Sequence, residues 1–355
     1  DLLESKPYVD IILGPDSYRR IPDIIKDRKL KQTHHVDTRL SKFDVYEDLL
    51  PSRKEGINGW ISISRGCDKF CTFCIVPFTR GRERSRSLKS IISETKDAVS
   101  SGFVEITLLG QNVNSYRTES GSFANLLQKV SEIDGVKRLR YMSPHPQDMG
   151  TDILEVMKNS DNICNNIHLP LQSGSSRILK RMNRTYTQKD FLNLVDLIRK
   201  YIPDCSISTD VIVGFPGETD EEFNDTLKVM DHVVFDRAFM FKYSSRPGTK
   251  ASEYTDQIDE CVKQERLEEL ISLQHLHTLK ANQRHIGKVL KVLVEKESKK
   301  SSSHWIGRTE GNMGVIFNKG NERIKDIIPI FINDAQGVSM FGTSIIEQEF
   351  LDEIN

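Results

Sequence analysis

Residues 59–282 alternate between short apolar runs and longer stretches with the residue spacing of amphipathic helices. The short runs predict strands at residues 59–64, 103–109, 137–142, 166–169, 206–213 and 234–242. The longer stretches predict helices at residues 88–101, 123–132, 151–159, 187–200, 219–230 and 259–282. Strict strand–helix alternation predicts an α/β fold with a parallel sheet, either open or curled into a partial (βα)6 barrel. In such folds the chemistry lies in the loops that follow the carboxyl ends of the strands.

The two ends of the chain carry different patterns. An apolar run ends at Gly14-Pro15-Asp16 and a helical stretch follows to Ile25, which predicts that residues 1–28 are the tail of an α/β domain. Residues 29–56 are polar and rich in Lys and Arg, so we expect a linker there, before a central domain at residues 57–283. From residue 284 to 355, short β-rich runs separated by Gly, Asn and Ser predict a small all-β domain. Those runs are Val289–Val294, Val315–Phe317 and Ile327–Ile332.

Composition places few limits on function. Hydrophobic residues make up 37% and charged residues 28% of the 355-residue chain, which is typical of a cytosolic protein, so we expect a cytoplasmic location. No apolar run approaches the roughly 18–20 residues of a membrane helix, and no signal peptide is visible. Because the net charge is only −1, any case for RNA binding depends on local basic patches. One such patch contains Arg80, Arg82, Arg84 and Arg86, which suit phosphate contacts but also fit a solvated face.

Three of the six cysteines, Cys67, Cys71 and Cys74, lie within eight positions after the first predicted strand. Thiolates are the ligands of iron–sulfur clusters, and three ligands leave one iron of a four-iron cluster open. A structural zinc site is the alternative, but such sites use four ligands, usually as two pairs, and no second pair or histidine lies in this loop. The other cysteines are widely separated and are most simply buried small apolar residues. They are Cys164, Cys205 and Cys261.

The spacing C-x3-C-x-aromatic-C resembles the motif of the radical S-adenosylmethionine (SAM) superfamily. That resemblance implies a 4Fe–4S cluster held by Cys67, Cys71 and Cys74, with SAM bound to the open iron. It also implies that the reduced cluster splits SAM into methionine and a 5′-deoxyadenosyl radical. Phe73 occupies the aromatic position of the motif, whose backbone is implied to face the adenine of SAM.

Further segments narrow the resemblance to MiaB-type tRNA methylthiotransferases, and they run in order through most of the chain. They are residues 74–82, 109–116, 143–146, 168–175, 181–184, 210–219 and 245–249. The forms Gly110-Gln-Asn-Val-Asn114 and Ser143-Pro-His-Pro146 are similar to the tRNA branch rather than to the branch that modifies a ribosomal protein. Residues 307–312 resemble part of the TRAM module, which grips RNA.

This resemblance implies methylthiolation at C2 of N6-isopentenyladenosine beside the tRNA anticodon, with one SAM supplying the methyl group and another the radical. The implied partners are the tRNA anticodon stem-loop, SAM and an electron donor such as flavodoxin or ferredoxin, with no membrane and a monomeric protein. SAM contacts are implied at Phe73, Gln111, Asn112, Gln172, Ser173, Arg184, Asp210, Val213 and Gly214. Substrate contacts are implied at Arg80, Arg82, Asn114, Tyr243, Arg246 and Arg308.

Several of these residues also have a structural interpretation. Gln111 and Asn112 follow the second strand, where their amides can reach a cofactor or simply satisfy the loop. Ser173 can contact ribose or form a turn with the glycine after it. Asp210 lies late in the fifth strand, where a buried carboxylate needs a partner, so we expect a cofactor or supporting role. For His145 and His168 a structural role is favoured over proton transfer.

The chain departs from the family in one respect, because no cysteine precedes Cys67. The family is implied to hold a second, auxiliary 4Fe–4S cluster on three cysteines of an N-terminal domain, and residues 8–25 resemble only the tail of that domain. We therefore expect that the numbered chain omits the domain, and that it cleaves SAM without inserting sulfur.

Two other functions stay open at this stage. One is a radical SAM methylthiotransferase that acts on a ribosomal protein or on another RNA base. The other is a non-catalytic RNA-binding protein with a structural metal site.

Overall fold

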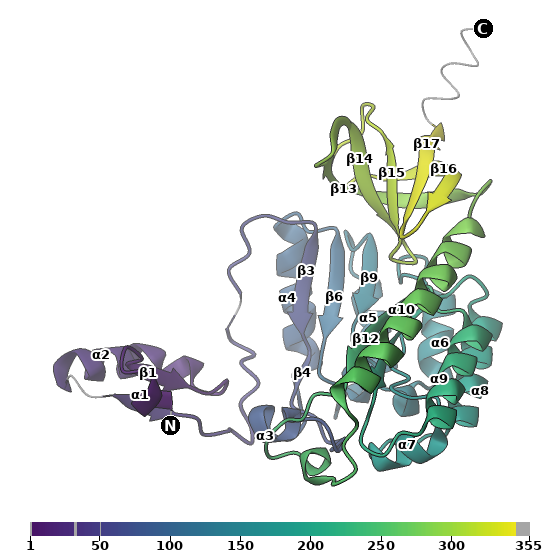
Figure 1. Cartoon of the computed structure of the whole chain (residues 1–355). Coiled ribbons are helices and arrows are strands. Elements are labelled where there is room, and N and C mark those ends of the chain that lie inside the picture. The colour runs from purple at the N-terminus through teal and green to yellow at the C-terminus, as the bar shows by residue number, and fades with distance from the viewer. Residues whose placement is uncertain (1, 32–33, 50, 346–355) are drawn as a thin grey trace, which may run out of the picture.

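The computed structural model describes residues 2–31, 34–49 and 51–345, and its centre is a curved layer of six parallel strands (Figure 1). The strands form two parallel sheets in the orders β3-β6-β9 and β10-β11-β12, which a single bridge between Leu139 and Ile163 connects. Their bounds are β3 (Asn58–Ser62), β6 (Glu105–Leu109), β9 (Arg138–Tyr141), β10 (Asn166–His168), β11 (Ser206–Val213) and β12 (Arg237–Lys242). The predicted partial barrel is confirmed, and its two edge strands are β3 and β12.

Six helices cover the outer face of this barrel. They are α4 (Leu88–Ser100), α5 (Phe123–Ser131), α6 (Thr151–Lys158), α8 (Gln188–Tyr201), α9 (Asp220–Val233) and α10 (Glu260–Gln283). Alternate strand residues such as Ile61, Leu108 and Val211 are fully buried against them in one continuous core. Side chains of Ser87, Thr187 and Thr219 cap three of these helices by accepting hydrogen bonds from backbone N–H groups. Each predicted strand and helix of this region is present.

The predicted bounds differ from the structure most clearly before β12. The prediction began this strand at residue 234, but Val234 ends α9 in the left-handed region, with φ of 51°, and the strand begins at Arg237. Short elements in the strand–helix loops were not predicted. They are α3 (Val76–Arg80), α7 (Ser176–Arg181), the hairpin of β4 (Ser64–Arg65) with β5 (Arg84–Ser85), and the hairpin of β7 (Arg117–Thr118) with β8 (Gly121–Ser122).

Residues before β3 form a small α/β unit that contacts the barrel through buried charges. It contains α1 (Leu2–Ser5), β1 (Ile11–Leu13), α2 (Ile21–Lys31) and β2 (His35–Asp37), and β1 and β2 pair in parallel. The region expected to be a linker therefore includes a strand. Asp16, which is buried, forms ion pairs with Arg65 at 3.4 Å and with Arg84 at 3.2 Å.

The C-terminal strands close into a separate five-stranded barrel, as the β-rich pattern predicted. Its strands are β13 (Val289–Ser298), β14 (Ser301–Thr309), β15 (Gly314–Asn318), β16 (Ile327–Gln336) and β17 (Ser339–Ser344). Strands β14 and β17 were not predicted, because β14 begins in the serine-rich stretch that looked like a loop. Residues 346–355 of the expected C-terminal domain lie outside the described residues. No helix in the described ranges is long and apolar enough to cross a membrane.

A buried ionic network joins this β-barrel to the amino ends of the central strands. Glu105, which is fully buried, accepts hydrogen bonds from Arg140 at 2.8 Å and from Arg308 of β14 at 2.6 Å. Arg140 also donates to the carbonyl oxygens of Thr309 and Glu310, and Arg138 donates to those of Lys291 and Arg308. Burial opposes the charge of Glu105, but the two guanidinium groups lower its pKa below the ordinary value.

Replacing this carboxylate tests how strongly the network joins the two barrels. Glu105→Gln leaves buried Arg140 without its counter-charge and leaves Arg308 paired with Glu295 alone, so we expect it to lower the free energy of unfolding by about 3–5 kcal/mol. Urea unfolding followed by fluorescence of Trp305, which is buried in the β-barrel, measures the change. The control, Glu132→Gln, removes an exposed pair with Lys129 and should cost less than about 1 kcal/mol. Equal effects of the two substitutions would contradict the structural importance of the network.

Candidate functional site

The three clustered cysteines lie on a loop at the carboxyl end of the central strands, close to α3 (Figure 1). The loop begins at Gly66, whose φ is +76°. A Cβ at this position would lie 2.1 Å from the carbonyl oxygen of Arg82, so the close passage of the two backbone segments requires glycine. Phe70, in the middle of the loop, also has a positive φ, of 47°, and its ring is half-exposed.

Two neighbouring strand–helix loops hold the cysteine loop in place. The backbone N–H of Gly66 donates to Oε1 of Gln111 at 2.6 Å. On the other side, Nδ2 of Asn183 donates to the carbonyl oxygens of Lys69 and Phe70, at 3.1 and 2.9 Å. Thr72 adds a backbone bond to Met182. The side-chain oxygen of Gln111 thus supports the cysteine loop, and the SAM contact implied for this residue stays a prediction.

The thiols of Cys67, Cys71 and Cys74 are partly buried and act electrostatically on one another. Burial and then the charges of Cys71 and Cys74 raise the pKa of Cys67 to about 11. Within the described ranges, no group of three or more His, Cys, Asp or Glu side chains is arranged so that it could hold a metal ion. The chemistry of the donor set nevertheless fits an iron–sulfur cluster, because three thiols on one loop supply three ligands and leave one iron open.

Buried polar atoms beside this loop fit an amino-acid-like cofactor. Oε1 of Gln172, Oδ1 of Asn112 and Nε of Arg184 are all buried, and none has a hydrogen-bond partner among the described residues. Gln172 also has a positive φ of 66°. Its backbone N–H donates to the carbonyl oxygen of Asp210, and its carbonyl oxygen accepts the N–H of Ile212, both in β11. A buried polar atom without a partner costs free energy, so such atoms gathered at strand ends indicate a ligand site. SAM carries the amino, carboxylate and hydroxyl groups that would satisfy them.

The remaining predicted cofactor residues lie on the same loops. Phe73 contacts Phe215 edge to face, with ring centroids 6.4 Å apart, and Arg184 lies over the Phe73 ring at 5.9 Å. Gly214 has φ of +67°, and a Cβ there would lie 2.3 Å from Cγ of Lys263. Val213 is fully buried before it. The loop of Gly214 and the segment of Arg184 therefore lie against the end of the cysteine loop.

Asp210 does have the buried partner that its position in β11 led us to expect. Its Oδ2 lies 3.2 Å from Nε2 of His168 on β10, and Nδ1 of His168 lies 3.1 Å from Oγ of Ser208. These side chains alternate with core residues of the same strands, so they occupy the inner, concave face of the barrel. The backbone carbonyl of Asp210 also accepts the N–H of Gln172 at 2.8 Å. His168 is thus a structural partner that faces the interior of the site.

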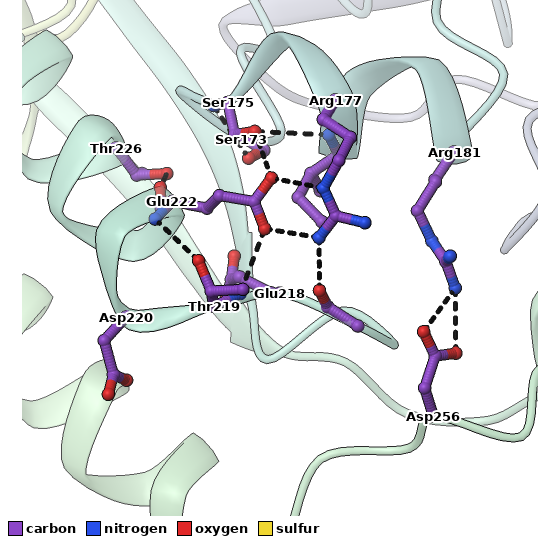
Figure 2. Close-up of polar contacts among 12 residues, drawn as sticks. Ser173, Ser175, Arg177, Arg181, Glu218, Thr219, Asp220, Glu222, Thr226 and Asp256 are labelled. Carbon is purple, nitrogen blue, oxygen red and sulfur yellow. Dashed lines mark hydrogen bonds and ion pairs between the residues drawn. The ribbon is translucent and has the colours of Figure 1, made fainter.

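A polar clamp joins the loop of Ser173 to the start of α9, and Glu222 is its centre (Figure 2). Glu222 accepts hydrogen bonds from Oγ of Ser175 at 2.9 Å, from Nε of Arg177 at 2.7 Å and from the backbone of Thr219 at 3.0 Å. Burial opposes its ionisation, but the hydrogen bonds from Arg177, Thr219 and Ser175 lower the pKa of Glu222 to about 2. The clamp fixes the two loops that carry Gln172 and Gly214.

The predicted substrate residues are more dispersed. Arg80, Arg82 and Arg246 are exposed near the carboxyl ends of the strands, with Arg82 paired to Asp68 at 2.6 Å. Asn114 is buried and exchanges hydrogen bonds with the backbone of His145, so it joins two loops. Tyr243 is buried in a small apolar cluster with Phe215. Arg308 lies at the opposite end of the barrel in the network with Glu105.

Two of the four arginines in the predicted basic patch are structural. Arg84 pairs with Asp16 and Arg86 pairs with Glu94, and all four side chains are buried. Sequence analysis also missed Phe239 and Phe241, two half-exposed residues on the concave face of β12. The signal available in the sequence was a pair of aromatic residues at alternate positions of the last predicted strand. In the structure this is an edge strand, so it has a neighbouring strand on one side only.

The clamp predicts a specific dependence on pH. Because the folded-state pKa of Glu222 is about 2 and its ordinary value is 4.5, the ionised form stabilises the fold above pH 4.5, and this contribution declines as pH falls toward 2. Glu222→Gln should lower the free energy of unfolding at pH 7 by at most about 3 kcal/mol. The loss should be smaller than this limit, because Arg177 is half-exposed and solvent screens its charge. At pH 3, the difference in free energy of unfolding between Glu222→Gln and wild type should be about half of its value at pH 7 or less. Chemical unfolding at each pH measures it, with exposed Asp134→Asn as control. A gap that does not change with pH would contradict this account.

Two family models match the chain. The model described as Radical SAM superfamily matches residues 61–230, which contain the cysteine loop and the clamp. The model described as TRAM domain matches residues 283–345, which form the C-terminal β-barrel. Among solved structures, the cobalamin-dependent S-adenosylmethionine radical enzyme OxsB has a TM-score of 0.50 and 12% sequence identity, over 77% of this chain and 41% of that one. This likeness shows the fold alone.

Curated relatives are far more similar. The chain is 44% identical to the tRNA-2-methylthio-N(6)-dimethylallyladenosine synthase of Christiangramia forsetii, over 97% of this chain and 76% of that protein. It is 45% identical to the synthase of the same name from Bacteroides fragilis, over 97% of this chain and 77% of that protein. With a radical SAM match over the site and a TRAM match over the β-barrel, the chain belongs to the family of tRNA-2-methylthio-N(6)-dimethylallyladenosine synthases.

Proposed function

We propose that this protein is a radical SAM transferase that adds a methylthio group to C2 of N6-dimethylallyladenosine (N6-isopentenyladenosine) in tRNA. The observation that carries the proposal is the loop of Cys67, Cys71 and Cys74 beside buried polar atoms without partners, in a chain 45% identical to such synthases. When bound, the cluster supplies the electron that splits SAM and so generates the radical. The protein's part is to hold, orient and shield the reactants.

Each candidate residue has a proposed task in this scheme. Cys67, Cys71 and Cys74 would hold the cluster, and Phe73 would face the adenine of SAM. Gln172, Asn112 and Arg184 would satisfy their unpaired atoms on the polar groups of SAM. Further contacts would come from Gln111, Ser173, Asp210, Val213 and Gly214. Because Glu222 and Arg177 fix the two neighbouring loops, we assign them a positioning role.

The tRNA would approach the end of the barrel that carries the cysteine loop. Exposed Arg80, Arg82 and Arg246 could reach phosphates there, whereas buried Asn114 and Tyr243 would shape the site from below. Arg308 would act through its position in the β-barrel. We take residues 1–28 as the tail of a preceding domain, 29–56 as a connection, 57–283 as the radical SAM domain and 284–355 as the TRAM domain.

An external one-electron carrier, such as flavodoxin or ferredoxin, would reduce the cluster. A hollow of about 350 Å³ beside the cysteine loop supports this, because Cys71 and Cys74 line it together with Phe70 and Phe78. Lys180 and Lys250, which also line it, suit an acidic partner. We further propose that the protein acts as a monomer in the cytoplasm.

Replacing the cysteines one at a time tests the cluster assignment. Cys67→Ala, Cys71→Ala and Cys74→Ala should each lose most of the bound iron after anaerobic reconstitution, and should form less than about 1% of the wild-type 5′-deoxyadenosine, since one ligand is missing. Cys261→Ala removes an exposed cysteine elsewhere and is the matched control. Iron analysis and chromatography of SAM products measure both quantities. Zinc in place of iron, with no SAM cleavage by wild type, would contradict the proposal.

A further inference from the structure

The last strand of the central barrel presents two aromatic rings to its interior. Ala238 and Met240 of β12 pack against the main core, so Phe239 and Phe241 point to the opposite, concave face. Each of these two phenylalanines has 53% of its surface exposed. Large apolar side chains that stay exposed together, inside a site rather than on a convex surface, indicate that something apolar covers them.

Their neighbours place these rings inside the proposed active site. Phe239 pairs in register with Asp210, and its ring meets that of His168 edge to face, with centroids 5.8 Å apart. Phe241 pairs in register with Ile212, two residues before Gly214. Toward the carboxyl ends of the strands, the rings therefore lead directly to the loop proposed to hold SAM.

Charged side chains fill the opposite end of the barrel interior, at the amino ends of the strands. Arg237 precedes Phe239 on the concave face, and burial together with the positive charges of Arg308 and Arg140 lowers its pKa. The Glu105 network lies at this level and fills the amino end with paired charges. The two phenylalanine rings are thus an apolar surface of the interior between the charged amino ends of the strands and the proposed cofactor site at their carboxyl ends.

We propose that Phe239 and Phe241 bind the dimethylallyl group of the substrate adenine and so make the enzyme select prenylated tRNA. This inference rests on the proposed function, which supplies an adenine that carries a five-carbon apolar substituent on N6. The base must leave the helical stack to reach the interior.

The chemistry also argues against a merely structural role for the two rings. A structural phenylalanine at an edge strand would bury most of its surface against neighbouring side chains, as Phe235 and Phe215 do. Burying a five-carbon group against aromatic carbon is worth enough to favour the prenylated base by about 10- to 100-fold, allowing for incomplete burial.

Binding of two synthetic anticodon stem-loops to the anaerobically reconstituted protein tests this inference. The RNAs are identical except that one carries N6-dimethylallyladenosine and the other adenosine, and both are measured at one salt concentration. Wild type should prefer the prenylated RNA by about tenfold or more. Phe239→Ala/Phe241→Ala should reduce the preference to less than about threefold, by weakening only the prenylated RNA. Phe239→Leu/Phe241→Leu, which keeps apolar volume, should restore most of it.

The control is Phe43→Ala, because the Phe43 side chain is 87% exposed on the N-terminal segment. It should keep the wild-type preference. An unchanged preference in the double alanine variant, or equal weakening of both RNAs, would overturn the inference while leaving the proposed function standing. Failure of the proposed function would look different, because neither RNA would bind even to wild type, and the inference would fall with it.

Discussion

One buried carboxylate, Glu105, determines how the two barrels of this protein meet. It lies at the amino end of β6 and has no exposure to solvent, so its charge is tolerable only because Arg140 and Arg308 both contact it. Arg308 belongs to the C-terminal β-barrel, which therefore completes the charge balance of the central one. Paired charges and backbone carbonyl groups close the barrel at the amino ends of its strands. The interior is therefore open to reactants at the carboxyl ends.

The parallel direction of the six strands makes that other end the site. All their carboxyl ends meet there, so every strand–helix loop can contribute a side chain. The cysteine loop, the amide of Gln172 and the glycine turn at Gly214 come from three different loops, and backbone hydrogen bonds and the Glu222 clamp hold them together. The loops carry buried polar atoms without partners, among them those of Gln172, Asn112 and Arg184. Such atoms gathered at the strand ends are what a binding site for a polar cofactor offers.

Local patterns in the sequence were sufficient for the six strands and six helices of the central barrel and for the cysteine loop, but not for the short elements in the strand–helix loops, for β2, or for β14 and β17. Alternation of six strand–helix units predicted the partial barrel, and the spacing of Cys67, Cys71 and Cys74 predicted the metal chemistry. Roles that depend on distant contacts were not predictable in this way. Arg84 and Arg86 looked like phosphate ligands, but their partners Asp16 and Glu94 come from other elements. Phe239 was not singled out, because sequence alone does not show that its face of β12 is open. The contacts that the resemblance implies for SAM and tRNA stay predictions.

Nucleoside mass spectrometry tests the central claim most directly. Prenylated tRNA would be incubated anaerobically with reconstituted protein, SAM and dithionite, using this chain alone and this chain joined to the auxiliary-cluster domain that the family resemblance implies. The account predicts 5′-deoxyadenosine from both forms and 2-methylthio-N6-dimethylallyladenosine from the joined form. Formation of 5′-deoxyadenosine by both forms without any modified nucleoside would contradict the assignment of tRNA as substrate.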